Sequence, residues 1–298
     1  MASRCQRCAP HEVINIRKMR TWRVMTSHPW NKSFVWQNHT ATSGALTQTQ
    51  IDHFDSDGYV IVNDIFTPGE LQELVAITDS AQADAAAVLA AQPNERIAIS
   101  EIGAITFAAQ LASRKPEIHK FVKNTKIMGA CRDLVGPDVR MYHDQAVYKQ
   151  IEKPRRFPWH QDNGYLFVEP QHYLTCWIAL NDATIENGCP QIIPGLHKNG
   201  TLSHYMVSTL GYECFENPPS TPVVAEIKAG GAVFFSSLTP HLTGPNCSNN
   251  VRKAYIVQYA RHDAIVLEGN AADGAPTGSH TIASEPRGMA VLESSKIC

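Results

Sequence analysis

The stretch that spans residues 221–260 reads TPVVAEIKAG GAVFFSSLTP HLTGPNCSNN VRKAYIVQYA. It contains three short runs rich in β-branched and aromatic residues, at 222–228, 231–237 and 253–260. Clusters of Gly, Pro and Asn separate these runs, a composition that is typical of short strands joined by turns. The stretch therefore predicts consecutive strands of an antiparallel β structure.

Two similar runs lie upstream, at 139–150 and 173–182. No long helical pattern alternates with any of these runs, so a parallel sheet built from β-α-β units is not expected. Helical signals instead precede the strands. The sequence therefore predicts a mainly β fold with flanking helices, in which a double-stranded β-helix (a jelly roll, cupin-like) forms the core.

The helical signals begin with two capping patterns, Thr47-Gln-Thr-Gln50 and Thr67-Pro-Gly-Glu70. Each places a threonine at the N-cap and a Gln or Glu at the third helical position, which satisfies two backbone N–H groups reciprocally. A third helical region is expected over about 116–135, ended by Gly136-Pro137. These helices are expected to pack on one face of the jelly roll.

Composition excludes several classes of protein. The chain has 298 residues, of which 43% are hydrophobic and 18% charged, with a formal net charge of −2. That balance suits a globular domain and offers no overall positive field for nucleic acid or an anionic membrane. No run of 18 apolar residues is present to cross a bilayer. The expected partner is a small-molecule substrate, with no nucleic acid and no membrane, and the expected assembly is a monomer or a homodimer.

The eight cysteines have irregular spacings. A chain of this length does not need disulfides to fold, so we expect free thiols in a reducing compartment, which favours a cytoplasmic location. Residues 1–44 contain seven Lys or Arg and one acidic residue. They are expected to form a basic, disordered extension, with a transit peptide and an organellar location as the alternative. The catalytic domain is expected at 45–265 and a C-terminal tail at 266–298.

Three residues form a candidate metal site: His160 and Asp162 in Trp159-His-Gln-Asp-Asn163, and His241 in Thr239-Pro-His-Leu-Thr243. Two imidazoles and one carboxylate on one face of an iron ion leave positions open for a co-substrate and O₂. On an extended chain, side chains two residues apart point the same way, so His160 and Asp162 can bind one ion.

The His-x-Asp pattern alone is not specific, because His53-Phe-Asp55 also matches it. That second pair falls in a predicted helix, where residues two apart do not share a face. His53 and Asp55 are therefore expected to be surface polar residues.

Arg252 is a candidate anion-binding residue, eleven positions after His241. If 231–242 and 252–260 pair as antiparallel neighbours, Arg252 lies beside His241 on the inner face. A guanidinium there can hold the far carboxylate of a dicarboxylate bidentately, and Thr243 can add a hydroxyl contact. The alternative is an ordinary surface arginine in a salt bridge.

Over about 46–262, the sequence resembles the phytanoyl-CoA dioxygenase-like family of Fe(II)/2-oxoglutarate oxygenases. The motifs that carry the resemblance are Trp159-His-Gln-Asp162, Thr175-Cys-Trp-Ile-Ala-Leu180, Glu186-Asn-Gly-Cys189, Pro194-Gly-Leu-His197, and Pro240-His241 followed by Arg252. The resemblance implies Fe(II) bound by His160, Asp162 and His241, and O₂ and 2-oxoglutarate as co-substrates. It also implies 2-oxoglutarate contacts from Arg252, Thr243, Trp177, Gln145 and Lys149.

The family resemblance implies a dioxygenase that hydroxylates an unactivated C–H bond while 2-oxoglutarate is decarboxylated to succinate. The expected substrate is small and largely apolar, either an acyl-CoA or a small metabolite. We expect segments 100–110, 139–147 and 163–172 and the segment after Arg261 to line its pocket, with the aromatic side chains of Phe107, Tyr142, Tyr165 and Phe167. Two alternatives stay open: a non-catalytic jelly-roll protein that binds a metal or ligand, and a zinc hydrolase, which would not need Arg252.

Overall fold

The computed structural model describes residues 25–42, 44–284 and 288–298. Both predicted capping boxes are confirmed. Helix α1 (Gln48–Asp57) begins after Thr47, whose side chain accepts a hydrogen bond from the Gln50 N–H. Helix α2 (Pro68–Ala90) begins after Thr67, which is bonded in the same way to Glu70. The third helical region is divided into α3 (Leu111–Arg114), α4 (His119–Val122) and α5 (Thr125–Leu134).

The divisions in that third region follow from its sequence. A 3₁₀ turn at Pro116–Ile118 separates α3 from α4, because Pro116 cannot donate a helical hydrogen bond. Asn124 then caps α5 by accepting from the Lys126 N–H. Further 3₁₀ turns lie at Pro93–Glu95, Asp162–Gly164, Leu196–Asn199, Ser208–Leu210, Ala271–Asp273 and Ile282–Ser284.

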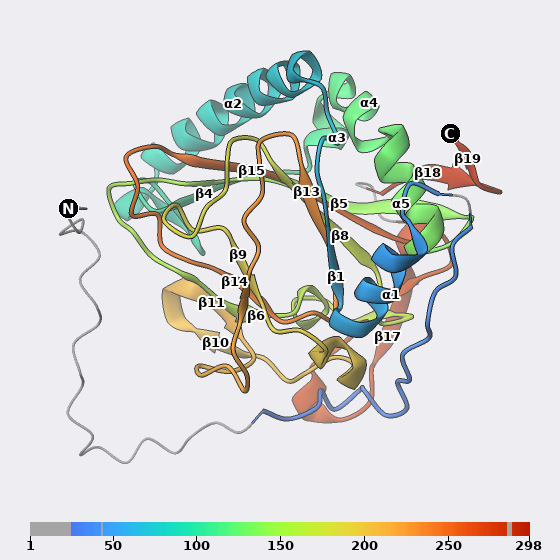
Figure 1. The fold of residues 1–298 in the computed structure, drawn as a ribbon. Coiled ribbons are helices and arrows are strands. Elements are labelled where there is room, and N and C mark those ends of the chain that lie inside the picture. The colour runs from blue at the N-terminus through green and yellow to red at the C-terminus, as the bar shows by residue number, and fades with distance from the viewer. Residues whose placement is uncertain (1–24, 43, 285–287) are drawn as a thin grey trace.

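Two antiparallel sheets form the core, as predicted for a jelly roll (Figure 1). The major sheet runs in the order β1 (Tyr59–Val62), β13 (Ala232–Ser236), β8 (Leu174–Ala179), β15 (Arg252–Arg261), β5 (Val139–Lys149), β4 (Ile105–Ala109), β3 (Ser100–Glu101) and β2 (Arg96–Ile97). The minor sheet runs in the order β12 (Val223–Val224), β9 (Pro190–Ile192), β14 (His241–Thr243) and β6 (Phe157–His160). Smaller pairings join β10 (Tyr205–Val207) to β11 (Gly211–Glu213), and β16 (Ile265–Glu268) to β7 (Val168–Glu169) and β17 (Gly278–Thr281).

One predicted pairing is wrong. Strands β13 and β15 are not neighbours, because β8 lies between them in the major sheet. The residues after β13 cross to the minor sheet as β14, and the chain returns to the major sheet only at β15. Strands β13, β14 and β15 thus alternate between the sheets, and Arg252 pairs with Lys149 of β5 rather than lying beside His241.

The two faces of the major sheet have different neighbours. Alternate residues of β15, including Tyr255, Val257 and Tyr259, pack in one hydrophobic cluster with helical residues such as Leu74 and Phe121. The residues between them point the other way, because side chains alternate along a strand. This inner face lies opposite the minor sheet and carries the functional side chains described below.

The boundary expected between residues 44 and 45 does not match the described part of the N-terminus. Residues 25–42, here called the N-terminal strap, pack along the domain. Ser27 forms a β-bridge with Leu202. Asp55 is only 6% exposed and accepts hydrogen bonds from Trp36 Nε1, at 3.1 Å, and from the backbone N–H of His39, at 2.6 Å. The surface role expected for Asp55 is therefore wrong; residues 1–24 lie outside the described residues.

The C-terminal tail expected at 266–298 is also part of the fold where it is described. Strand β17 extends the small sheet by pairing with β16, and β18 (Met289–Glu293) pairs with the first residues of β5. Strand β19 (Lys296–Ile297) pairs in turn with β18. Val291 and Leu292 are buried, so this segment is held by apolar packing as well as by strand pairing.

The expectation of free thiols is confirmed for Cys131, Cys176, Cys189, Cys214 and Cys298. It is wrong for Cys247, which is disulfide-bonded and sits, partly exposed, in the loop between β14 and β15. Among the described residues, no helix is both long enough and apolar enough to cross a membrane.

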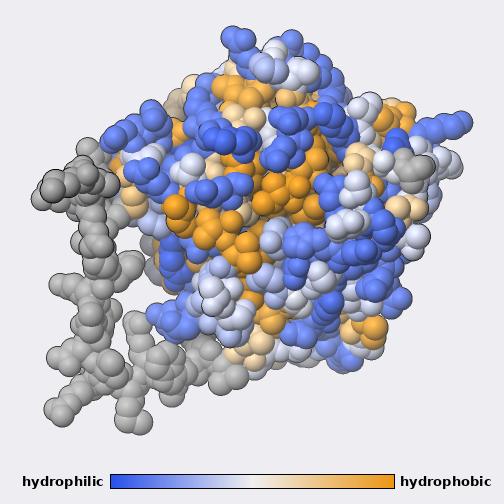
Figure 2. Space-filling model, in the orientation of Figure 1, coloured by the Kyte–Doolittle hydropathy of each residue, from blue (hydrophilic) through white to orange (hydrophobic). Residues whose placement is uncertain are grey.

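Hydrophobic residues also gather on the surface. Figure 2 shows them in the middle of one face, surrounded by hydrophilic residues. In the same orientation, β1 and β9 pass through this area (Figure 1). Val223 and Val224 of β12, which pairs with β9, are 36% and 42% exposed. The minor sheet thus has an apolar open edge.

His197 is expected to make stability depend on pH. It is fully buried against Trp36 of the strap, with ring centroids 4.3 Å apart, and burial lowers its pKa to about 4. Because histidine in the unfolded chain titrates near 6.5, the unfolded state binds more protons between pH 6.5 and 4. This residue should therefore cost up to about 3 kcal/mol of unfolding free energy as the pH falls through that window.

Urea unfolding of the metal-free protein at pH 7 and pH 4.5 measures this effect. Between pH 7 and pH 4.5, the unfolding free energy of the His197→Gln variant should fall by less than that of the wild type. The difference should correspond to the uptake of about one proton on unfolding, whatever the stability of the variant at pH 7. An equal slope in the variant and the wild type would contradict the assignment.

Candidate metal and co-substrate site

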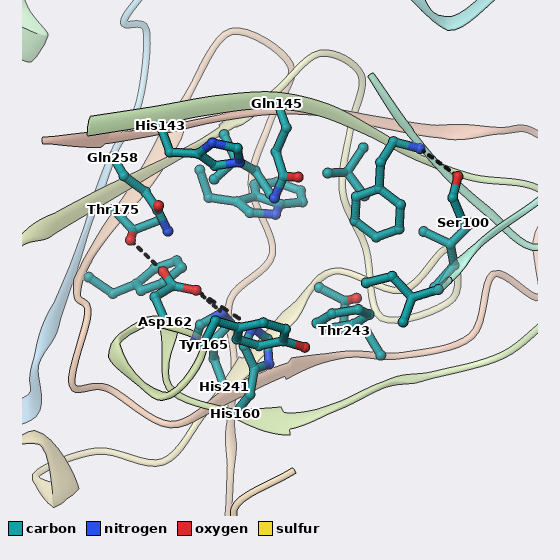
Figure 3. A pocket seen from close by; sticks show the side chains of 18 of the residues that line it. Ser100, His143, Gln145, His160, Asp162, Tyr165, Thr175, His241, Thr243 and Gln258 are labelled. Carbon is teal, nitrogen blue, oxygen red and sulfur yellow. Dashed lines mark hydrogen bonds and ion pairs between the residues drawn. The ribbon is translucent and has the colours of Figure 1, made fainter. Parts of the chain in front are cut away.

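His160, Asp162 and His241 come together at the junction of β6 and β14 (Figure 3). His160 ends β6 and His241 begins β14, and the two residues are direct partners in the antiparallel pair. The Nε2 atoms of His160 and His241 lie 3.6 Å and 3.9 Å from Asp162 Oδ1. Within the described residues these are the three side chains whose ligand atoms cluster closely enough, within 4.8 Å, to hold a metal ion.

Backbone carbonyls orient both imidazoles. His160 Nδ1 lies 2.8 Å from the carbonyl oxygen of Pro158, and His241 Nδ1 lies 2.9 Å from that of Thr239. A carbonyl can only accept, so each Nδ1 carries the proton and each Nε2 presents a lone pair to the centre of the group. A backbone carbonyl that accepts from the other ring nitrogen commonly fixes the tautomer of a metal-binding histidine.

The protonation states also suit a metal. Burial lowers the pKa of His241 to about 4, so its ring is neutral near pH 7. Burial alone would raise the pKa of Asp162, but the interactions with His160 and His241 and the hydrogen bond from Thr175 outweigh it and hold this pKa below its ordinary value. The carboxylate is therefore ionised and the imidazole is neutral, as metal ligation requires.

Thr175 holds the carboxylate from the opposite sheet. Its Oγ1 donates to Asp162 Oδ2 at 2.5 Å, from the second residue of β8. We expect Thr175→Val, which keeps the shape and removes the donor, to weaken metal binding by about ten- to a hundredfold. Thr175→Ser should retain near wild-type affinity. Competition with a fluorescent chelator gives the metal affinity directly, and unchanged binding in the valine variant would show that this bond does not position Asp162.

Arg252 lies at the start of β15 and is 1% exposed. Its guanidinium is 5.1 Å from the centre of the Trp177 ring, and its Nε and Nη1 have no hydrogen-bond partner among the described residues. Burial lowers its pKa to about 9, so it remains charged at pH 7. A buried cation with two unpaired donors fits a bidentate carboxylate ligand.

Lys149 has a different role from the one expected. Its Nζ donates to the carbonyl oxygens of Arg155, at 3.0 Å, Thr243, at 2.9 Å, and Gly244. These bonds use all three protons of the ammonium group, which fastens the end of β14 to β5. Its pKa is held well below the ordinary value by burial, with the charge of Arg252 as a further cause. Lys149 thus shapes the wall next to Arg252 rather than offering a free donor.

A cavity of about 340 Å³ connects these groups. All eight residues singled out from the sequence line it: Gln145, Lys149, His160, Asp162, Trp177, His241, Thr243 and Arg252. Phe107, Tyr142 and Tyr165 also line it. The expectation is wrong for Phe167, which packs against His28 and Trp30 of the strap instead. It is also wrong for the described residues after Arg261 (262–284 and 288–298), none of which lines the cavity.

Sequence reasoning missed Thr175, Ile256 and Gln258, which also line the cavity. One signal was present: Arg252, Ile256 and Gln258 are separated by even numbers of residues on one strand, so they share a face. Thr175 has the same relation to Trp177 on β8. Extending the alternation from the predicted arginine and tryptophan would have found all three.

A family model described as phytanoyl-CoA dioxygenase (PhyH) matches residues 54–254, which include the histidines, the aspartate and Arg252. The chain belongs to this family. It is similar to a phytanoyl-CoA dioxygenase of Arabidopsis thaliana, with 24% identity over 257 residues that cover 74% of this chain and 91% of the relative. It is also similar to an ectoine dioxygenase of Bordetella parapertussis, with 26% identity over 226 residues that cover 68% and 72%.

Solved structures share the fold of this family member. The α-ketoglutarate-dependent carbocyclase SnoK from nogalamycin biosynthesis has a TM-score of 0.63 and 23% identity, covering 78% of this chain and 93% of SnoK. EctD from S. alaskensis, solved with 2-oxoglutarate and 5-hydroxyectoine, has a TM-score of 0.61 and 21% identity, covering 82% and 86%. With the family established, the protein is an Fe(II)- and 2-oxoglutarate-dependent dioxygenase that uses O₂.

Proposed function

We propose that this dioxygenase hydroxylates a C–H bond of a small, largely apolar substrate in the 340 Å³ cavity. His160, Asp162 and His241 are proposed to bind Fe(II), and Arg252 to bind 2-oxoglutarate. The observation that carries the proposal is the buried, unpaired guanidinium of Arg252 in the same cavity as the His–Asp–His group.

The residues of the two sheets have separate tasks in this proposal. The minor sheet supplies both histidines, and the major sheet supplies Arg252 together with Trp177, whose ring covers the guanidinium. Arg252 binds and orients the carboxylate at the far end of the co-substrate, which leaves its 2-oxo acid end for the metal. The metal and co-substrate, when bound, supply the oxidising chemistry, with succinate as the second product.

The walls of the cavity support an apolar substrate. Ile97 and Leu166, which line it, are 47% and 45% exposed and so lie at its mouth. Phe107, Val147 and Phe157 continue the apolar lining inside. The volume lies at the lower end of the range for small-molecule sites. A small metabolite fits this description, as does the acyl end of an acyl-CoA.

The two adjacent arginines that precede β6 are already paired. Arg155 Nη1 lies 3.1 Å from Glu101, and Arg156 Nη1 lies 2.5 Å from Glu213. Because both guanidinium groups are paired, neither offers an unpaired cation to the phosphate groups of a CoA. These positions therefore do not favour an acyl-CoA over a small metabolite.

Anaerobic titration of the protein with Fe(II) and 2-oxoglutarate tests the proposal. Chelation of iron by the 2-oxo acid gives a charge-transfer absorption in the visible range, which we expect here. Admission of O₂ should then yield succinate, with the rate rising when a substrate is present. Iron binding without the absorption would contradict the proposed co-substrate site; absorption without succinate would favour the non-catalytic binding protein.

A further inference from the structure

The inner face of the major sheet carries a row of polar residues, two of which, Gln258 and His143, have no task in the proposed function. Gln258 of β15 pairs directly with His143 of β5 on one side and with Thr175 of β8 on the other. All three side chains line the cavity. Figure 3 shows Gln258 and Thr175 next to Asp162, with Thr243 on the far side of His160 and His241.

The amide of Gln258 faces the cavity without a partner among the described residues. The residue is 8% exposed, lines the cavity, and its side chain has no hydrogen-bond partner within 25–42, 44–284 or 288–298. A ligand that displaces water from this amide loses affinity unless it replaces the hydrogen bonds of that water. An amide offers both donors and an acceptor, so a ligand that satisfies Gln258 needs complementary polar atoms.

The carboxylate that Arg252 is proposed to hold lies far from this amide. Arg252 and Gln258 are six positions apart on the same strand, which corresponds to about 20 Å between their Cα atoms along β15. The far carboxylate of the co-substrate therefore does not satisfy Gln258. Thr175, the neighbour of Gln258, instead bonds the outer oxygen of Asp162. The polar row therefore lies beside the metal group, on the side away from the co-substrate anchor.

The charge of the lining limits what this ligand can be. The formally charged side chains among the lining residues are Lys149, Asp162 and Arg252. Lys149 is used by three carbonyls, and the other two serve the metal and the co-substrate in the proposed function. A carboxylate or an ammonium group at the polar row would be buried without a counter-ion, which is costly.

We propose that Gln258 binds an uncharged hydrogen-bonding group of the substrate, such as a carboxamide or lactam, with His143 beside it. The substrate then has a neutral polar head near the metal group and an apolar body that extends along the apolar walls. This inference rests on the proposed function, since it takes the other half of the cavity to be the co-substrate site.

Binding of three matched probes tests the proposal. Hexanamide, hexanoate and hexylamine share one chain and differ in the head group. Each is titrated at pH 7 into protein loaded with Zn(II) and saturated with 2-oxoglutarate, so that no turnover occurs and Arg252 is occupied; saturation-transfer NMR reports binding. We expect hexanamide to bind and both charged probes to bind at least about tenfold more weakly, because they would lose solvation without gaining a counter-ion.

Two variants assign the preference to Gln258. Gln258→Leu, similar in size but without the amide, should weaken hexanamide binding about tenfold. Gln258→Glu should shift the preference to hexylamine, because it places an anion in the row. Gln72→Leu, on the exposed face of α2, is the matched control and should bind all three probes as the wild type does.

Three results would overturn the inference: no binding of hexanamide to the wild type, equal binding of hexanoate, or wild-type hexanamide affinity in Gln258→Leu. Thermal unfolding of each variant shows whether it is folded. The charge-transfer absorption with Fe(II) and 2-oxoglutarate should be the same in Gln258→Leu as in the wild type. Its absence from the wild type would defeat the proposed function separately, whatever the probes show.

Discussion

Asp162→Ala is expected to abolish the charge-transfer absorption with Fe(II) and 2-oxoglutarate and to reduce succinate formation by more than a hundredfold. The change removes the anionic member of the three-residue group and leaves two imidazoles whose Nε2 atoms no longer face a carboxylate. Loss of an outer partner alone costs ten- to a hundredfold in metal affinity or activity, so loss of a ligand costs more. Anaerobic absorption spectroscopy and metal analysis measure the two effects.

The matched control is Asp182→Ala. Asp182 is exposed and pairs with Lys228 on the surface, so its loss should leave the absorption unchanged. Full absorption in Asp162→Ala would place the metal elsewhere in the protein, and the His–Asp–His assignment would fail.

Arg252→Met is expected to weaken 2-oxoglutarate binding by about a hundred- to a thousandfold while metal binding stays near normal. Removal of one partner of a buried, hydrogen-bonded ion pair costs about 3–5 kcal/mol. The same change should leave the ligand-free protein equally or more stable, because it replaces a buried charge that has two unpaired donors with an apolar chain of similar length. Isothermal titration with 2-oxoglutarate and thermal unfolding without ligands measure the two opposite effects.

Arg261→Met provides the comparison for this change. Arg261 lies at the other end of β15 and pairs with Asp263 on the surface, so its loss should not affect co-substrate binding. If Arg252→Met keeps wild-type affinity, the dicarboxylate is held by other residues. If it lowers the stability of the ligand-free protein strongly, the guanidinium has a structural task instead.

The sequence predicted the residues of the site better than the way the fold assembles them. His160 and Asp162 could be selected from their spacing on an extended chain, although Asp162 in fact begins a 3₁₀ turn just after β6. Arg252 was expected near His241 by direct strand pairing. It reaches the same cavity from the opposite sheet, because the chain changes sheets between β13 and β14 and again between β14 and β15. The hydrophobic pattern of a strand does not show to which of the two sheets the strand belongs.

Other misses have local physical causes. Strands β9 and β14 have three residues each, too few to show a periodicity of two. The N-terminal strap belongs to the stretch 1–44, whose excess of basic over acidic residues is typical of disorder. It is held by side-chain acceptors elsewhere: Asp133 accepts from the N–H and hydroxyl groups of Thr42, at 3.0 Å and 2.8 Å, and Asp55 accepts from His39. Such long-range acceptors cannot be identified from the strap's own composition.

The division of the site between two sheets has a consequence for heat resistance. In the proposed assignment, the minor sheet holds the metal ion and the major sheet holds the far carboxylate of 2-oxoglutarate. A co-substrate that chelates the ion therefore links the two sheets. Ligands that bind only the native state raise the free energy of unfolding by mass action, about 2.7 kcal/mol at a hundred times the dissociation constant. The melting temperature should therefore rise more with Fe(II) and 2-oxoglutarate together than the sum of their separate effects.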